Sequence, residues 1–192
     1  MKISIKPAKM RKKTKEKLHK IFGHVMATVS ILLVIIVFGG AYYFIIAPNM
    51  VSKPNIPKPS LPDDALFRIR AGERVIQEEH INYLVNELDG YKLKKPFGSD
   101  NYPIIEVVLT DVGSVFYSYV VDHVPITKRG NAKNEDIVIK SEQEVVMNVL
   151  YSADIASAVK EANDNGEIQV ELVSGMKTLA AKGFLSLYDK IK

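Results

Sequence analysis

The chain has 192 residues, with 26 basic and 22 acidic side chains, a formal net charge of +4 and no cysteine. The lack of cysteine excludes disulfides, thiolate catalysis and cysteine-ligated metal sites. The positive charge belongs to the N-terminal part, because residues 63–192 hold 15 basic and 21 acidic side chains, a net charge of −6. The overall pI of about 9.0 therefore does not favour nucleic-acid binding by residues 63–192, and we expect no nucleic-acid partner.

The segment 25–47 contains no charged residue. At about 1.5 Å per residue it forms a helix of roughly 34 Å, enough to cross a hydrocarbon core of about 30 Å. Thr28 and Ser30 are compatible with a span, because a helical hydroxyl can donate to the carbonyl one turn earlier. A buried core helix and a cleaved signal peptide are the alternatives. The length of the segment and the lack of a small-x-small cleavage site favour an uncleaved transmembrane helix.

The charges on either side of this segment predict its orientation. Residues 1–24 hold nine basic side chains and one acid, whereas residues 48–62 hold only Lys53 and Lys58. The positive-inside rule then places the basic tail, residues 1–24, in the cytoplasm and residues 63–192 outside it. We therefore expect a single-pass protein of the cell membrane, with a signal anchor and an extracytoplasmic domain. The basic tail is expected to contact anionic membrane lipids.

Residues 48–62 contain five prolines. Proline fixes its own φ and favours extended conformations in the residue before it, so this segment is predicted to be a semi-rigid linker with a reach of about 45 Å. Two roles are open for it. It is either a spacer set to reach a distant partner or a tether of no particular length.

The first half of the domain is predicted to hold a helix and three strands. Apolar residues at helical spacing predict a helix over 75–88 that Gly90 ends. Alternating apolar residues over 102–122, interrupted at 111–113, predict a β-hairpin. Residues 123–136 are expected to form a connection with an exposed turn at 128–131, followed by a short third strand at 137–139.

The second half is predicted to be mainly helical. Ser141 and Glu144 fit a capping box at a helix start, and a second helix is expected over 153–162. A strand over 168–172 precedes one closing amphipathic helix over 176–191, with Lys182 on its polar side. The expected fold class is α+β: a transmembrane helix, a Pro-rich linker and a small antiparallel sheet packed against helices. The apolar stripe of the closing helix comprises Met176, Leu179, Ala180, Gly183, Phe184, Leu187 and Ile191.

The sequence holds no motif typical of an active site. His80 and His123 lack the partners and spacing of a zinc site. Neither a nucleophile elbow nor a glycine-rich phosphate loop occurs, and no pair of carboxylates is singled out for acid–base chemistry. We therefore expect no catalytic residue, no metal, no cofactor and no enzymatic activity.

The second half of the domain resembles the sterol-carrier-protein family of small lipid-binding domains. The resemblance is densest over 137–191: a strand that ends in a serine and acids (137–142), a pair of helices, the segment 165–170 (NGEIQV) and a closing helix. The sequence departs from the family at 151–153 (YSA), where a glycine is usual, and at Gly175, which falls later than the family's second glycine. The resemblance implies an apolar cavity enclosed by the sheet and the terminal helix.

Adaptable aromatic and methionine side chains are suited to contacts with a lipid or a partner. An ordinary filled core would use the same residue types, and the pattern leaves this choice open. The broader expectation is a non-catalytic interaction or accessory subunit of a membrane or cell-surface assembly, with a protein partner. The alternative is sterol-carrier-like binding or transfer of lipid at the membrane surface. The candidate contact residues are Phe116, Tyr119, Met147, Met176, Phe184 and Leu187.

Overall fold

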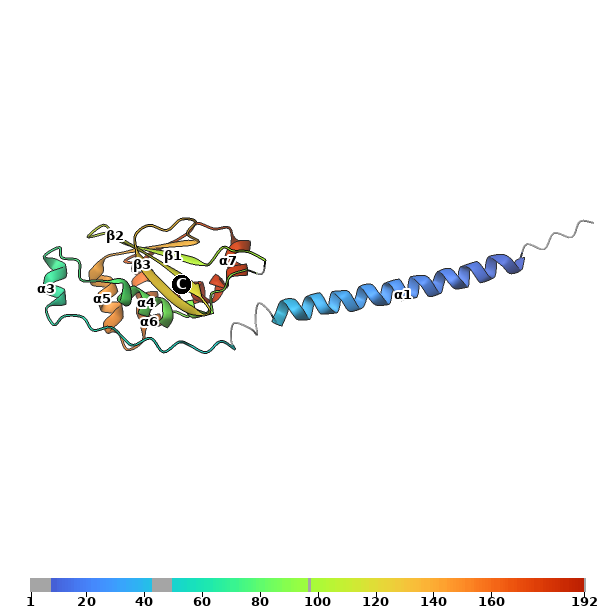
Figure 1. Cartoon of the computed structure of the whole chain (residues 1–192), viewed down its shortest axis with the longest axis horizontal. Helices are drawn as coiled ribbons and strands as arrows, with labels where there is room; N and C mark the ends of the chain where they lie inside the picture. The colour runs from blue at the N-terminus through green and yellow to red at the C-terminus, as the bar shows by residue number, and fades with distance from the viewer. Residues whose placement is uncertain (1–7, 43–49, 97, 192) are drawn as a thin grey trace, which may run out of the picture. The chain divides into compact units, whose positions relative to one another are not determined.

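The computed structural model describes residues 8–42, 50–96 and 98–191. The chain divides into two compact units, residues 1–47 and residues 48–192 (Figure 1).

The first unit contains one long helix, α1 (Ala8–Ala41), of 34 residues. Its segment His24–Ala41 is long and apolar enough to cross a membrane, and none of that segment is buried. The hydroxyls of Thr28 and Ser30 donate to the carbonyls one turn earlier, at 2.9 Å each, which confirms the predicted back-bonding. Residues 43–47, the last part of the predicted span, lie outside the described residues.

Residues 50–62, the described part of the predicted linker, contain no helix or strand. This segment contacts the second unit at several points. Lys53 pairs with Glu87, and the Asn86 side-chain amide donates to the carbonyl of Pro54 at 3.1 Å. Leu61 packs against the core. The contacts show that this part of the linker lies along the domain, while its role as a spacer stays a prediction.

The second unit is a mixed α+β fold built on a sheet of five strands in the order β3-β2-β1-β4-β5. The predicted hairpin is confirmed by the antiparallel pair of β1 and β2. The pair of β1 and β4 is parallel, so the prediction of an entirely antiparallel sheet is wrong. The strands are β1 (Ile104–Leu109), β2 (Ser114–Val121), β3 (Val124–Arg129), β4 (Ile137–Ser141) and β5 (Gln169–Leu172).

Strand β3 replaces the connection that was predicted over 123–136. It pairs with β2 along its whole length, and the predicted exposed turn at 128–131 begins inside it. The tight turn before it uses Asp122 and His123 at φ 48° and 65°, a backbone that asparagine and glycine more commonly supply. Pro125 is tolerated because β3 is an edge strand.

The chain then passes from β3 at the edge to β4 inside the sheet, beside β1. Between the two strands the Ala132 amide donates to the Glu106 carboxylate at 2.8 Å. Glu106 lies on the half-buried face of the sheet, opposite the face that is buried in the core. This connection is therefore a crossover past β2 and β1 rather than a hairpin, which explains why β4 runs parallel to β1.

Helices cover one face of the sheet, and the main core lies between them (Figure 1). In β1 the side chains of Ile105, Val107 and Leu109 point into this core, and their neighbours in sequence are half-buried on the other face. The helical elements of the unit are α3 (Ala65–Arg70), α4 (Glu78–Glu87), η2 (Gly90–Lys92), α5 (Gln143–Tyr151), α6 (Ile155–Asp164), α7 (Met176–Lys182) and α8 (Phe184–Ile191).

Three predicted helix starts differ from the structure, and the smallest difference is at α6, which begins at Ile155 rather than at 153. Helix α4 begins at Glu78 rather than at 75, because the amides of Val75 and Ile76 donate to the Gln143 side-chain oxygen instead of entering a helix. The prediction of a capping box formed by Ser141 and Glu144 is also wrong. Ser141 ends β4 and its hydroxyl donates to the Glu167 carbonyl at 3.2 Å, so Glu142 occupies the N-cap position of α5.

The closing helix is two helices, α7 and α8, and not the single one predicted. Gly183 separates them with a φ of 87°, a conformation that glycine adopts without steric penalty. On either side of this break the two helices bury different kinds of side chain.

Candidate functional site

The six predicted contact residues lie in four different environments. Phe116, Phe184 and Leu187 are buried in the main core. Met147 belongs to a smaller buried cluster beneath α3, Tyr119 lies half-buried on β2, and Met176 is 61% exposed. The structure therefore does not gather all six at one site, and their role in binding stays a prediction.

The interior beneath the sheet is filled. An apolar cavity of about 60 Å³ lies there, lined by residues of the sheet and of α4, α5, α6 and α8. Pockets for small ligands typically have about 300–1,000 Å³. A cavity of 60 Å³ is too small for an acyl chain, so among the described residues this region is an ordinary packed core.

A second apolar hollow, which we call the edge crevice, opens where the strand edge meets α7 and α8. Its volume is about 90 Å³, and it brings together three of the six predicted residues, Met176, Phe184 and Leu187. Leu172, Met176 and Leu185 are exposed large apolar side chains on its walls, and Val173 beside them is exposed as well. The complete lining is Ile137, Val170, Leu172, Met176, Leu179, Phe184, Leu185, Leu187, Tyr188 and Ile191.

A third hollow, of about 820 Å³, is a cleft lined mainly by polar and charged residues. Its walls come from the loop before β1, the loop before β4, and α7, and Tyr119 reaches it from β2. We call it the polar cleft. Its lining is Pro96, Ser99, Asp100, Asn101, Tyr102, Ile104, Tyr119, Lys133, Asn134, Asp136, Ser174, Lys177, Thr178, Ala181 and Lys182.

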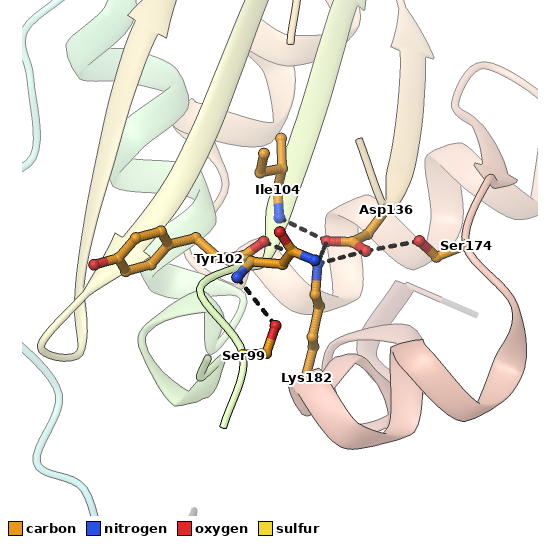
Figure 2. Close-up of polar contacts among 7 residues, drawn as sticks. Ser99, Tyr102, Ile104, Asp136, Ser174 and Lys182 are labelled. Carbon is orange, nitrogen blue, oxygen red and sulfur yellow. Dashed lines mark hydrogen bonds and ion pairs between the residues drawn. The ribbon is translucent and has the colours of Figure 1, made fainter. Parts of the chain in front are cut away.

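A buried ion pair forms the floor of the polar cleft (Figure 2). The side chains of Lys182 and Asp136 are 5% and 1% exposed, and the ammonium donates to both carboxylate oxygens at 2.9 and 2.8 Å. Lys182 also donates to the Tyr102 carbonyl at 2.9 Å, so three acceptors surround the ammonium. The carboxylate accepts further bonds from the Ser174 hydroxyl at 2.7 Å and the Ile104 amide at 2.8 Å.

The backbone of Asp136 extends this network. Its amide donates to the Ile104 carbonyl, and its own carbonyl accepts from the amides of Val173 and Ser174. One residue therefore joins the start of β1, the start of β4, the end of β5 and α7. Because the charges of both side chains are fully satisfied, this arrangement fits a structural role. The prediction that Lys182 lies on the polar side of its helix is wrong.

The buried Asp136–Lys182 ion pair was not predicted from the sequence, although one signal for the burial of Lys182 was available. Lys182 follows the buried Leu179 by three residues, which places it on the inner face of a helix. Asp136 gave no comparable signal, because its segment was predicted to be a loop.

A second group of charges lies near the C-terminal end of the chain. The Asp89 carboxylate pairs with Lys190 of α8 at 2.8 Å and with Lys92 at 3.0 Å. Partial burial raises the pKa of Asp89, but the hydrogen bonds from Lys190 and Lys92 outweigh it and hold the pKa below the ordinary value of 3.8. Burial and the neighbouring Asp89 charge raise the pKa of the Tyr91 phenol.

The two domain histidines have hydrogen-bonded rings. His80 is buried and its Nδ1 accepts the Gln77 amide at 3.0 Å, at the first turn of α4. His123 Nδ1 lies 3.1 Å from the Tyr91 carbonyl. Within residues 8–42, 50–96 and 98–191 no group of three or more histidine or acidic residues is placed to hold a metal ion.

Comparisons with known proteins add a likeness among solved structures. No family model matches the chain, and neither does any curated protein. The solved structure of the UbiJ-SCP2 ubiquinone synthesis protein is 12% identical, with a TM-score of 0.35, and the match covers 58% of this chain and 92% of that one.

The stereoselective inverting sec-alkylsulfatase Pisa1 from Pseudomonas sp. is 13% identical, with a TM-score of 0.36. That match covers 57% of this chain and 16% of the sulfatase, so this chain corresponds to a small part of it. The family that the sequence resembles, the sterol-carrier proteins, is thus named in one of the matched structures.

Proposed function

We propose that this chain is a membrane-anchored, non-catalytic subunit whose extracytoplasmic domain binds a protein partner through the edge crevice. One observation carries the proposal: the interior is filled, whereas apolar side chains stay exposed around a hollow at the edge of the sheet. Recognition then takes place on the surface of the domain and not inside it.

The size and rim of the edge crevice fit an inserted side chain. Its 90 Å³ equal about three water volumes, which suits one apolar side chain better than a whole lipid. Leu172, Met176 and Leu185 surround it with exposed apolar surface. Interfaces commonly consist of one apolar anchor seated in a pocket with contacts around it that exclude water. The partner we propose is therefore a protein that inserts an apolar anchor here.

The anchoring part of the proposal rests on α1. Its segment His24–Ala41 is apolar and unburied, which is costly for a helix in water and favourable for one in lipid. The excess of basic residues before it supports a cytoplasmic N-terminus. Protease added to intact cells is then expected to remove residues 63–192 and to spare the tail. Protection of residues 63–192 would contradict the orientation.

Site-specific photo-crosslinking in cells tests the edge crevice. A photo-reactive amino acid at Leu185 is expected to form a discrete protein adduct, and the same group at Lys160, exposed on α6, is expected to form none. The adduct should disappear when Leu172→Lys is added, provided that the melting temperature of the variant is unchanged. An equal adduct at Lys160, or adducts with lipid alone, would contradict a protein partner at this site.

Lipid binding is the second candidate function, and one residue favours it. Ile191 lines both the interior cavity and the edge crevice, so an outward movement of α8 would join the two hollows. Native mass spectrometry of the full chain released from detergent tests this candidate. A lipid retained in equimolar amount, and lost in Ile191→Trp, is the expected result if α8 opens. A lipid-free spectrum would contradict it.

A further inference from the structure

The polar cleft differs in charge from the domain around it. Residues 63–192 carry a net charge of −6. Three lysines and two aspartates line the cleft, and both aspartates are already paired. Asp136 holds Lys182, and Asp100 holds Lys95 at 3.2 Å. The cleft is therefore a locally basic site on an acidic domain.

Two lysines of the cleft are available to contact a ligand. Among the described residues, Lys133 and Lys177 form no ion pair, and both are exposed. Lys182 is not available in this way, because its ammonium already has three acceptors. Lys133 lies on the loop before β4 and Lys177 on α7, so the two charges come from different walls of the cleft.

The Asp136–Lys182 ion pair at the floor of the cleft fixes the positions of these two walls. The Asp136–Lys182 pair joins the loop before β4 to α7, which are the segments that carry Lys133 and Lys177 (Figure 2). A site that is held in place before binding loses less entropy when a ligand arrives. Side chains that can donate hydrogen bonds also line the cleft, among them Asn101, Asn134 and Thr178.

We propose that the polar cleft binds a multiply charged oxyanion, bearing phosphate or carboxylate groups, between Lys133 and Lys177. Its volume of about 820 Å³ is within the range of small-molecule sites. This inference goes beyond the proposed function, because the edge crevice uses other residues of α7, Met176 and Leu179. Binding of an anion and binding of a protein partner can therefore succeed or fail separately.

Calorimetric titration of the full chain in a neutral detergent tests the inference. Sodium pyrophosphate is the soluble probe, and short-chain phosphatidylglycerol below its micellar concentration is the lipid probe. The variants are Lys133→Gln and Lys177→Gln. Lys160→Gln, on α6 outside the cleft, removes the same charge and serves as control. A contact between unit charges in water corresponds to about a fivefold change in affinity, so each cleft variant should bind about fivefold more weakly.

The outcomes are distinct. Pyrophosphate binding that weakens in both cleft variants and not in Lys160→Gln supports a soluble oxyanion. Binding of phosphatidylglycerol alone, with the same dependence on Lys133 and Lys177, supports a phosphate-bearing headgroup. Absence of binding by both probes overturns the proposal. Equal weakening in the control also overturns it, because the effect would then come from the overall charge. Unchanged melting temperatures show that the variants are folded.

Discussion

Helices α7 and α8 follow one another across Gly183, yet they are attached to the domain by different forces. Helix α8 buries three apolar side chains in the main core, Phe184, Leu187 and Ile191. Helix α7 buries Leu179 and the charged Lys182, and it leaves Met176 exposed. The same terminal segment thus contains an apolar attachment and an ionic one.

The two attachments contribute differently. Each fully buried Phe, Leu or Ile side chain stabilises a fold by about 1.5–3 kcal/mol. A buried ion pair gains much less overall, because the desolvation of both charges offsets their attraction. Removal of one member is nevertheless costly, since the other charge is left buried without its partner. We infer that α8 supplies stability, whereas the ion pair of α7 fixes the position of the helix.

The apolar attachment is expected to give the largest effect. Phe184→Asp places a carboxylate in the main core, where Phe184 is 2% exposed. Truncation of a buried Phe costs about 3–5 kcal/mol, and an unpaired charge should cost more, against a total of about 5–15 kcal/mol for a domain. Near-ultraviolet circular dichroism of the full chain in detergent should show no cooperative transition. An unchanged melting temperature would mean that Phe184 lies on a binding surface.

Breaking the ionic attachment should have the next largest effect. Lys182→Ala leaves the Asp136 carboxylate buried without its cation, at a cost of about 3–5 kcal/mol in urea unfolding. The double variant Lys182→Met with Asp136→Asn removes both charges, and we expect it to recover most of that loss. A double variant as unstable as Lys182→Ala would contradict the argument from desolvation.

Substitution of Gly183 should have a smaller effect on the free energy of unfolding. Its φ of 87° disfavours any side chain, and a Cβ there would lie 3.4 Å from the Lys92 carbonyl oxygen. Gly183→Ala is expected to cost about 1–2 kcal/mol in urea unfolding. Gly175→Ala is the matched control, because Gly175 has a φ of −64° and open space around it. Equal effects at the two glycines would show that the left-handed junction is not required.

The difference between α7 and α8 also shows what the sequence could predict. Apolar spacing identified the stripe of α8 and the β1–β2 hairpin, since burial of apolar side chains follows the period of the element. The spacing of Lys182 from Leu179 was the one sequence signal of its burial, and it was not used, so Lys182 was assigned to the wrong side of its helix. No pattern identifies a partner that is 46 residues away, and the polar cleft above the ion pair was not predicted at all.

Local motifs were less reliable than periodicity. Ser141 matched a capping box, but the strand before it continues through Ser141 and directs its hydroxyl to the Glu167 carbonyl. Strand β3 was missed because its turn, Asp122-His123, lacks glycine and asparagine. For Ser141 a contact with a distant segment overrides a local preference, whereas β3 forms a local hairpin whose turn has an uncommon sequence. Three of the six predicted contact residues line the edge crevice, and their role in binding stays a prediction.

The smallest effect is expected at the charged contact of α8, between Lys190 and Asp89. Asp89→Asn removes this ion pair together with the one to Lys92, and it keeps the backbone because asparagine tolerates the φ of 66° found there. At neutral pH we expect a loss of about 0.5–1 kcal/mol, the value of a pair near the surface. Added salt should reduce this loss.

The pKa of Asp89 predicts how that loss depends on pH. The folded-state pKa is held below the ordinary 3.8, so the carboxylate gives up its proton more readily in the folded chain than in the unfolded one. Its contribution is therefore complete above about pH 4 and disappears as the pH falls through the folded-state pKa. Urea midpoints of wild type and Asp89→Asn should differ at pH 7 and converge under acid conditions. A difference that stays constant or widens in acid would assign the effect of the substitution to packing and not to the charge of Asp89.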